Sequence, residues 1–253
     1  MINNIVEKIY LKSKDCATNE IIKLYKKKSY CIVNFIYYAS ANKYIIENFN
    51  KDYYNSLINW DFLLPDGIAL KIFLKKKFDK NIKENLNWTD FVPYFLSSIK
   101  SSRTHIWFYT VYDEKIWKNS TDANKVELYI KNKFNPQKIY KAVSHYNSRW
   151  TDFNFKDYEN SLKWNFDFKI FLVWLWTPFQ EIWIKKNKKF FQKNNILIIN
   201  VWWLFDFWAW FEKRAPKLIR KLNLEWLWRF GQNPKKNFSK VLESIKLLKN
   251  LIN

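Results

Sequence analysis

The sequence predicts an α/β fold built on a doubly wound, mostly parallel sheet. Short apolar runs alternate along the chain with segments of helical spacing, and this β-α-β-α order is typical of such sheets. Most of the apolar runs lack a polar–apolar alternation, which indicates strands that are covered on both faces. The predicted strands are residues 30–36, 62–64, 104–111, 138–143, 168–174 and 196–201.

Helices are predicted between these strands. Thr89 is expected to cap a helix that begins with Asp90, whose carboxylate suits the first helical turn. Residues 113–134 and 179–192 also have helical spacing. In the tail, residues 235–253, the apolar side chains fall on one face and lysines elsewhere, so an amphipathic helix is predicted. That helix either packs on the domain or binds a membrane or a partner.

Composition limits the function classes without choosing among them. A chain of 253 residues with 48% hydrophobic residues can bury a sizeable core. The formal net charge of +21 favours nucleic acid, phosphorylated metabolites or an acidic membrane surface as partners, although biased base composition explains many lysines equally well. Cys16 and Cys31 form no close pair, which is typical of a reducing cytoplasm.

Several chemistries lack their sequence signature. The longest uncharged apolar run, residues 170–176, is far shorter than the roughly 20 residues of a membrane span, so only surface association stays open. No apolar leader follows Met1. His105 and His145 have no nearby cysteine pair and there is no Asp-x-Asp motif, so no metal site is expected. Glycine-rich nucleotide loops and a Gly-x-Ser-x-Gly motif do not occur.

Tryptophan and glycine usage is unusual. The chain has 15 tryptophans and 2 glycines, where average usage would give roughly 18 glycines. Four tryptophans lie in the stretch "WWLFDFWAW", residues 202–210. They are expected to form a membrane wedge, a base-stacking platform or a core, or to stand in place of another residue. A mixed fold needs glycine for tight turns and for close approach of the backbone to ligands.

Polar residues follow three of the predicted strands. Ligands of open α/β sheets bind beyond the carboxyl ends of the strands, so three such loops together predict a site. Taken singly, each residue has a structural explanation, as a turn residue, a first-turn helical residue or a solvated helical residue. The three loops carry Asp66 with Gly67, then Thr177, Gln180 and Glu181, then Asp206 and Arg214.

Five blocks of the sequence, in order, resemble one protein family. They are "LLPDGIAL", "NWTDF", "VWLWTPFQEIWI", "VWWLFDFWAWFEKRAP", and "LEWLWRF" followed by "NPKK". These blocks are similar to the signature motifs of the WecG/TagA/CpsF glycosyltransferases, glycosyltransferase family 26. The resemblance covers about residues 30–236, and the last three blocks are long and specific.

The departures from the family pattern are systematic. Some bacterial lineages read the UGA codon as glycine, whereas the usual alternative table renders it as tryptophan. That single difference explains the scarcity of glycine, the excess of tryptophan and the positions concerned. Tryptophan stands where the family has glycine at Trp88, Trp174, Trp176, Trp202, Trp203 and Trp210, and where the family has tryptophan at Trp183 and Trp226. The resemblance does not decide whether the remaining tryptophans are true tryptophans or stand in place of glycine; these are Trp60, Trp107, Trp117, Trp150, Trp164, Trp208 and Trp228.

The resemblance implies a Rossmann-like core over residues 1–222 and a basic helical appendage over residues 223–253. The implied activity is inverting transfer of a sugar, of the N-acetylmannosamine type, from a UDP-sugar to a polyprenyl-diphosphate-linked acceptor. Such products enter teichoic acid, enterobacterial common antigen or exopolysaccharide synthesis. The implied location is cytoplasmic, at the inner face of the cell membrane, with no cofactor and no metal. The resemblance leaves open whether the protein forms a homo-oligomer.

The resemblance also implies roles for individual residues. Asp66 matches the base that takes the proton of the acceptor hydroxyl. Without a metal motif, Arg214, Arg229 and nearby lysines are expected to neutralise the leaving UDP, together with backbone N–H groups. The positions expected to bind substrate are Asn34, Gly67, Thr89, Asp90, Thr177, Gln180, Glu181 and Asp206.

Two rival functions stay open from the sequence. A nucleic-acid or anionic-surface binding protein would use the positive charge with aromatic side chains on an exposed face; under the family interpretation no nucleic acid is expected. An inactive relative of the family is the alternative if the tryptophans are real.

Overall fold

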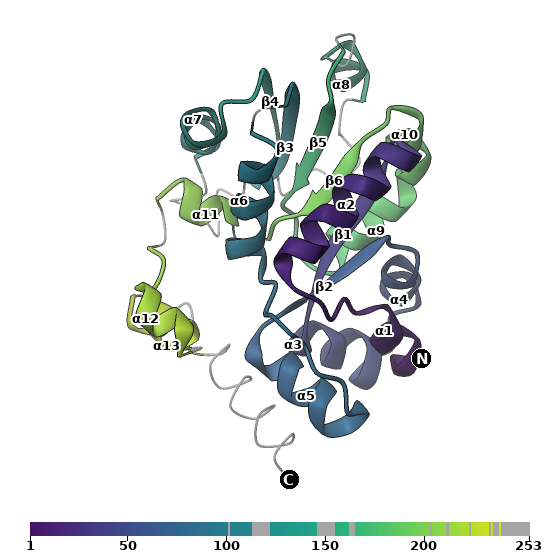
Figure 1. Ribbon diagram of the computed structural model, residues 1–253, viewed down its shortest axis with the longest axis vertical. Coiled ribbons are helices and arrows are strands. Elements are labelled where there is room, and N and C mark those ends of the chain that lie inside the picture. The colour runs from purple at the N-terminus through teal and green to yellow at the C-terminus, as the bar shows by residue number, and fades with distance from the viewer. Residues whose placement is uncertain are drawn as a thin grey trace.

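The computed structural model describes residues 1–100, 102–112, 122–145, 155–161, 165–202, 204–210, 213–222 and 224–232, with Pro234 and Phe238. In this part of the chain, six parallel strands form one sheet in the order β2-β1-β6-β5-β3-β4 (Figure 1). The strands are β1 (Cys31–Tyr37), β2 (Phe62–Asp66), β3 (Thr104–Tyr112), β4 (Lys138–His145), β5 (Phe168–Val173) and β6 (Leu197–Asn200).

All six predicted strands and their parallel arrangement are confirmed. The second strand is longer than predicted, because pairing with β1 continues through Pro65 to Asp66. Asp66 is therefore the last residue of β2 and lies at the carboxyl edge of the sheet. The strand order reverses between β1 and β6, which are neighbours, and ligands of doubly wound sheets bind at such a point.

Helices cover both faces of the sheet and its β2 side. One face packs on α2 (Lys14–Lys28), α6 (Trp88–Ser98), α7 (Ala123–Phe134) and α11 (Leu204–Trp208). The other packs on α9 (Phe179–Lys186) and α10 (Lys188–Lys193). Around Ile36 and Leu63 lie α1 (Ile2–Lys8), α3 (Tyr38–Ala41), the π-helical segment η1 (Asn42–Glu47), α4 (Lys51–Ile58) and α5 (Ile68–Phe78). The remaining helices are α8 (Phe155–Ser161), α12 (Lys217–Lys221) and α13 (Glu225–Gln232).

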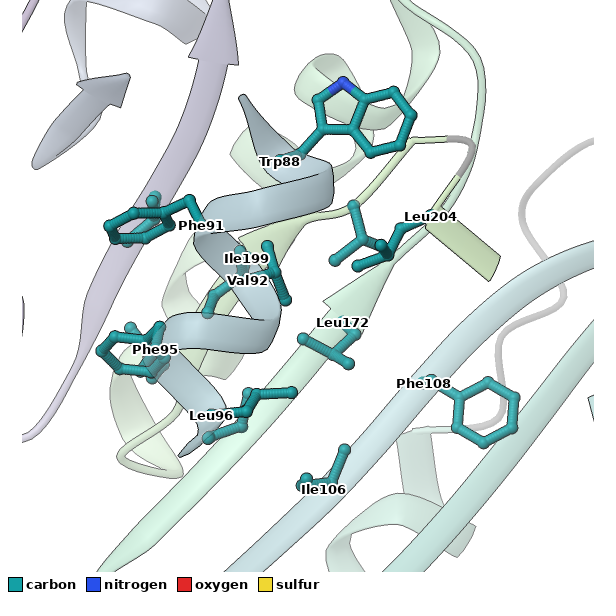
Figure 2. Close-up of a cluster of buried hydrophobic side chains, with 14 of the residues drawn as sticks. Trp88, Phe91, Val92, Phe95, Leu96, Ile106, Phe108, Leu172, Ile199 and Leu204 are labelled. Atoms are coloured by element: carbon teal, nitrogen blue, oxygen red, sulfur yellow. The ribbon is translucent and has the colours of Figure 1, made fainter. Parts of the chain in front are cut away.

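The packing of α6 shows why the strands read as continuous apolar runs. One side of this helix presents a row of large side chains to the sheet, and strand residues from β3, β5 and β6 meet them (Figure 2). Both faces of each strand are buried, so polar alternation is absent. The labelled residues of this layer are Trp88, Phe91, Val92, Phe95, Leu96, Ile106, Phe108, Leu172, Ile199 and Leu204.

The predicted cap of α6 is wrong by two residues. Asn87 caps the helix, and its side-chain Oδ1 accepts the backbone N–H of Asp90 at 3.0 Å. The Thr89 hydroxyl donates to the same oxygen instead of capping the helix itself. Asparagine caps at least as well as threonine, and its use draws Trp88 into the first turn. Asp90 does lie in that turn, as predicted.

Two other predicted helices differ from those observed. The segment 179–192 forms two helices, α9 and α10, separated at Asn187. The Asn187 side chain donates to the Trp183 carbonyl at 2.8 Å and competes with continued helical bonding. Of the segment 113–134, the structure describes α7 from Ala123 onward. The predicted tail helix, residues 235–253, lies outside the described residues except for Phe238.

No described helix combines the length and the apolar character that crossing a membrane requires.

Candidate active site

The first site loop begins where β2 ends. Gly67 follows Asp66 with φ +90°, a backbone conformation that favours glycine, and it precedes α5. Its N–H donates to the Asn85 side chain at 2.9 Å, and the Leu86 N–H donates to the Pro65 carbonyl at 3.0 Å. These two bonds hold the Asp66 loop beside the segment that leads into α6.

A cluster of buried polar residues lies at the carboxyl ends of β5 and β6 and beside the middle of β1. We call Asn34, Thr177, Gln180, Glu181 and Asn200 the polar cluster. All but the partly exposed Thr177 are 0% exposed. Asn200 donates to Asn34 at 2.8 Å, and both Thr177 and Gln180 donate to one Glu181 carboxylate oxygen at 3.0 Å. Residues far apart in the sequence thus converge at the point where the strand order reverses.

The hydrogen bonding of the polar cluster is incomplete. Oε1 of Gln180, Oε2 of Glu181 and Oδ1 of Asn200 are buried, and no described residue gives them a hydrogen bond of good geometry. Each unsatisfied buried polar atom costs about 1–3 kcal/mol, and native proteins keep few of them. A concentration of such atoms at the reversal of strand order is what a site for a polar ligand requires.

Burial governs the chemistry of Glu181. It raises the pKa of this carboxyl from its usual 4.5 to about 7, while hydrogen bonds from Gln180 and Thr177 and the nearby Asn34 amide partly oppose the rise. Burial also raises the pKa of Tyr53 in α4, and the negative charge of Glu181 contributes. The donors that bond to the Glu181 oxygen are neutral, so the carboxyl exchanges a proton near neutral pH.

The loop after β5 is also held by a hydrogen bond from η1. The peptide bond between Thr177 and Pro178 is cis, and the Thr177 carbonyl accepts the Tyr44 hydroxyl at 3.3 Å. Asp206, the predicted residue beyond β6, lies in α11 and is 0% exposed.

Asp90 and Arg214 are brought together in a second, charged cluster. Oδ1 of Asp90 contacts Arg214 at 2.9 Å and Arg220 at 2.8 Å, while Nε of Arg214 lies 3.1 Å from Glu225. The Arg214 guanidinium also lies over the Phe207 ring, 5.4 Å from its centroid. The side chain of Arg229, on α13, lies outside the described residues.

Two of the tryptophans at glycine positions have backbone conformations that suit glycine. Trp202, between β6 and α11, has φ +45°, and Trp210, after α11, has φ +59°. The other described non-glycine residues at positive φ are short and polar: Ser29, Asp79, Asn135 and Asn195. This agrees with the prediction that some of these positions need positive φ, where a bulky residue is strained.

Other indoles crowd the carboxyl edge. Trp174 directly follows β5 and meets the Phe205 ring edge-on at 6.2 Å. Trp202 meets Tyr37, at the end of β1, with ring centroids 4.6 Å apart. Trp88 is buried, and Trp176 is partly buried. Trp203 lies outside the described residues.

Trp183, which matches a tryptophan of the family, behaves as an ordinary core residue. Trp183, 8% exposed, packs against aromatic rings of β3, β5 and α10, as predicted for a true tryptophan. The Trp226 side chain lies outside the described residues. Among the unassigned tryptophans, Trp60, Trp107 and Trp208 are buried. Of the described tryptophans only Trp210 is largely exposed, at 68%, which does not fit a base-stacking platform.

Sequence reasoning missed two residues of this region. Asn200 stands at the end of an apolar run and was read as part of the strand. A polar residue at the end of a buried strand is itself a signal of a functional site. Arg220 lies in a helix that reads as solvated, and only the fold places it beside Asp90. Among the described residues, no group of three or more His, Cys, Asp or Glu side chains is arranged to hold a metal ion.

Comparison with known proteins matches the chain to one family. The family model described as "Glycosyl transferase WecG/TagA/CpsF family" matches residues 8–253, a wider range than the signature blocks alone. No curated protein matches the sequence. The match covers nearly the whole chain, and the fold is the Rossmann-like α/β sheet that the family resemblance implies. The chain therefore belongs to the WecG/TagA/CpsF glycosyltransferases, a family of cell-surface polysaccharide synthesis.

Proposed function

We propose that this protein is an inverting glycosyltransferase that uses a UDP-sugar of the N-acetylmannosamine type. The acceptor is a hydroxyl of a polyprenyl-diphosphate-linked sugar, and the product enters synthesis of teichoic acid or exopolysaccharide. The observation that carries the proposal is the polar cluster, because buried and incompletely bonded polar groups at the reversal of strand order suit a polar ligand such as a nucleotide sugar. No cofactor is assigned.

Asp66 is the base of the proposed reaction. It takes the proton of the acceptor hydroxyl as the oxygen attacks the anomeric carbon from the face opposite UDP. The bond between the anomeric carbon and the UDP oxygen breaks, UDP leaves with the electron pair, and the configuration inverts. The position of Asp66, last in β2 and half-buried before the positive-φ Gly67, supports this role.

The leaving diphosphate needs positive charge and N–H donors. Arg214 and Arg229 are the proposed cationic partners, with backbone N–H groups of the loops after β5 and β6. Gln180, Glu181, Asn34 and Thr177 are proposed to hold the sugar nucleotide, and Gly67, Thr89, Asp90 and Asp206 to complete the site. The contacts of Arg214 with Asp90 and Glu225 place its guanidinium beside the N-terminal end of α6.

The functioning chain is proposed to carry glycine at positions 88, 174, 176, 202, 203 and 210. The positive φ of Trp202 and Trp210 supports this, as does the crowding of the carboxyl edge by Trp174 and Trp202. Glycine at these positions would free backbone N–H groups to approach a diphosphate. UGG codons there, or indole masses in peptides of the native protein, would instead favour an inactive relative.

The proposed location is the inner face of the cell membrane, with residues 223–253 as the contact. An apolar hollow lined by Ile219, Leu224, Leu227 and Trp228 supports it, since exposed apolar patches mark interaction surfaces. Ending the chain after Leu222 is expected to abolish transfer and to weaken binding to vesicles that contain anionic lipid. Neutral vesicles are the control, and full activity of the shortened chain on a lipid-linked acceptor would contradict the location.

The direct test is release of UDP from a panel of UDP-sugars in the presence of a polyprenyl-diphosphate-linked acceptor. Two proteins are compared, one with the sequence as written and one with glycine at the six positions. UDP release that depends on both substrates, in the glycine-bearing protein only, is the expected result. No acceptor-dependent release from either protein with any UDP-sugar would contradict the proposed function.

A further inference from the structure

The C-terminal segment, residues 213–232, lies at the side of the molecule. In Figure 1 its helices α12 and α13 stand away from the sheet and from the helices that cover it. Ile219, Leu224 and Leu227 line an apolar hollow between these helices, and Leu218 and Leu222 are 69% and 59% exposed. Among the described side chains of this segment, Ala215, at 2% exposed, is the buried apolar one. These side chains therefore place little apolar surface against the core.

Among the described residues, the ion pairs that connect this segment to the core meet at one carboxylate, that of Asp90. Asp90 Oδ1 accepts Nη2 of Arg214 at 2.9 Å and Nη1 of Arg220 at 2.8 Å. Asp90 Oδ2 accepts the Asn87 side-chain amide at 3.0 Å, so both carboxylate oxygens have partners. Nε of Arg220 donates to the Ala215 carbonyl at 3.1 Å, which fixes the guanidinium relative to its own segment.

Among the described residues, two arginines of this cluster face two carboxylates, those of Asp90 and Glu225. Charge-assisted hydrogen bonds of this kind are suited to holding two parts of a protein together. Asp90 also lies in the first turn of α6, where the helix dipole favours a negative charge. The side chains of Asp90, Arg214 and Arg220 are 46%, 22% and 33% exposed, so salt partly screens their attraction.

We propose that Asp90 is a positioning residue that docks segment 213–232 onto the core by clamping Arg214 and Arg220. Docking fixes the positions of Arg214 and Arg220 relative to the loop before α6. It does the same for α13, which carries Arg229. That loop is in turn bonded to the Asp66 loop through Asn85 and Leu86. The consequence for turnover rests on the proposed function, whereas the docking itself does not.

The docking is tested by amide hydrogen exchange on the whole protein. Asp90→Asn keeps the size of the side chain and removes its charge, and is expected to speed exchange in α12 and α13 by about tenfold relative to α9. Asp90→Glu is expected to restore most of the protection. Raising salt to about 1 M, where the Debye length is about 3 Å, should loosen the unmodified protein in the same helices.

Asp167→Asn is the matched control. Asp167 pairs with Arg103 at 3.1 Å and also accepts the Arg103 backbone N–H, but at the opposite edge of the sheet. This variant should leave exchange in α12 and α13 unchanged. Equal protection of α12 and α13 in Asp90→Asn and in the unmodified protein would overturn the proposal, as would equal loosening by Asp167→Asn.

The turnover consequence is measured separately in the glycine-bearing protein. Asp90→Asn should raise KM for the UDP-sugar and lower kcat/KM by about tenfold, with partial recovery in Asp90→Glu. Faster exchange without any change in kcat/KM would overturn the positioning role. Absence of transfer in every variant, with faster exchange in Asp90→Asn, would contradict the proposed function and leave the docking supported.

Discussion

The two edges of the parallel sheet treat their carboxylates differently. At the amino edge, Asp61 accepts the Ile32 N–H at 2.9 Å and pairs with Lys28 at 3.2 Å, and Asp167 pairs with Arg103. At the carboxyl edge, Glu181 is 0% exposed and the groups that donate to it are neutral. The amino edge neutralises its acids locally, as a structural surface does. At the carboxyl edge, burial disfavours the charged form of Glu181. Groups with pKa values shifted in this way cluster at functional sites.

The turns at the two edges differ in the same way. Among the described residues, those with positive φ at the amino edge are Ser29, φ +62°, Asn135, φ +47°, and Asn195, φ +58°, whose side chains are small and polar. Beyond the carboxyl edge they are Gly67, Trp202 and Trp210. Only the glycine among these three suits its backbone, so two turns beside the proposed site conflict with the tryptophans of the given sequence.

The largest expected contrast is between two aspartates at the ends of β2. Asp66→Asn, in the protein with glycine at the six positions, should lower turnover on the order of 10²-fold while UDP binding changes little. Asp61→Asn, at the amino end, loses its ion pair with Lys28 and should leave turnover near normal. Steady-state kinetics and UDP titration measure both. Equal losses in the two variants would remove the distinction between the edges.

Glu181 should make stability fall as pH rises. Because its folded pKa is about 7 and its usual pKa 4.5, the folded protein binds the proton more tightly, and stability declines from about pH 4.5 to 7. The expected loss is roughly 3 kcal/mol, with full effect above pH 7. Urea unfolding at several pH values measures it, and Glu181→Gln should remove the slope. Glu20→Gln, which removes an exposed partner of Lys12, should not.

His105, near the amino edge, should act in the opposite direction. Burial, with Lys138 and Lys169 nearby, lowers the pKa of this histidine from its usual 6.5 to about 4. The unfolded chain therefore binds the proton more readily, and stability is lost as pH falls from about 6.5 to 4, by roughly 3 kcal/mol. His105→Gln should flatten the acid side of the same stability curve. An unchanged acid side would show that His105 does not titrate as described.

The smallest effect concerns Trp210. Its indole is 68% exposed and its φ of +59° follows the end of α11, a position where glycine commonly ends a helix. Trp210→Gly should therefore raise the free energy of unfolding by about 1 kcal/mol, against the usual trend for removing a tryptophan. Trp183→Ala is the contrast, since removing that buried ring should cost about 3–5 kcal/mol. Destabilisation by Trp210→Gly would contradict the glycine assignment at that position.

The sequence by itself determined the six strands, their parallel orientation and the three polar loops. Strands buried on both faces must be continuously apolar, and loops at their carboxyl ends must share one edge, so local patterns carry this information. The motif blocks likewise identified the family, because Gln180, Glu181 and Asp206 stand within long specific stretches. Even the conflict at Trp202 and Trp210 was visible as a tryptophan in place of a family glycine.

Only the tertiary structure decided which polar groups meet. The Asn34–Asn200 hydrogen bond joins residues 166 positions apart, and Asp90 meets Arg220 across 130 positions. No local pattern encodes such distances, because they depend on strand order and on how helices cross the sheet. The cap of α6 at Asn87 and the break at Asn187 are also tertiary outcomes, since several residues there can cap or interrupt a helix and packing selects one. The pKa of Glu181 follows for the same reason: burial, which the fold alone sets, raises it.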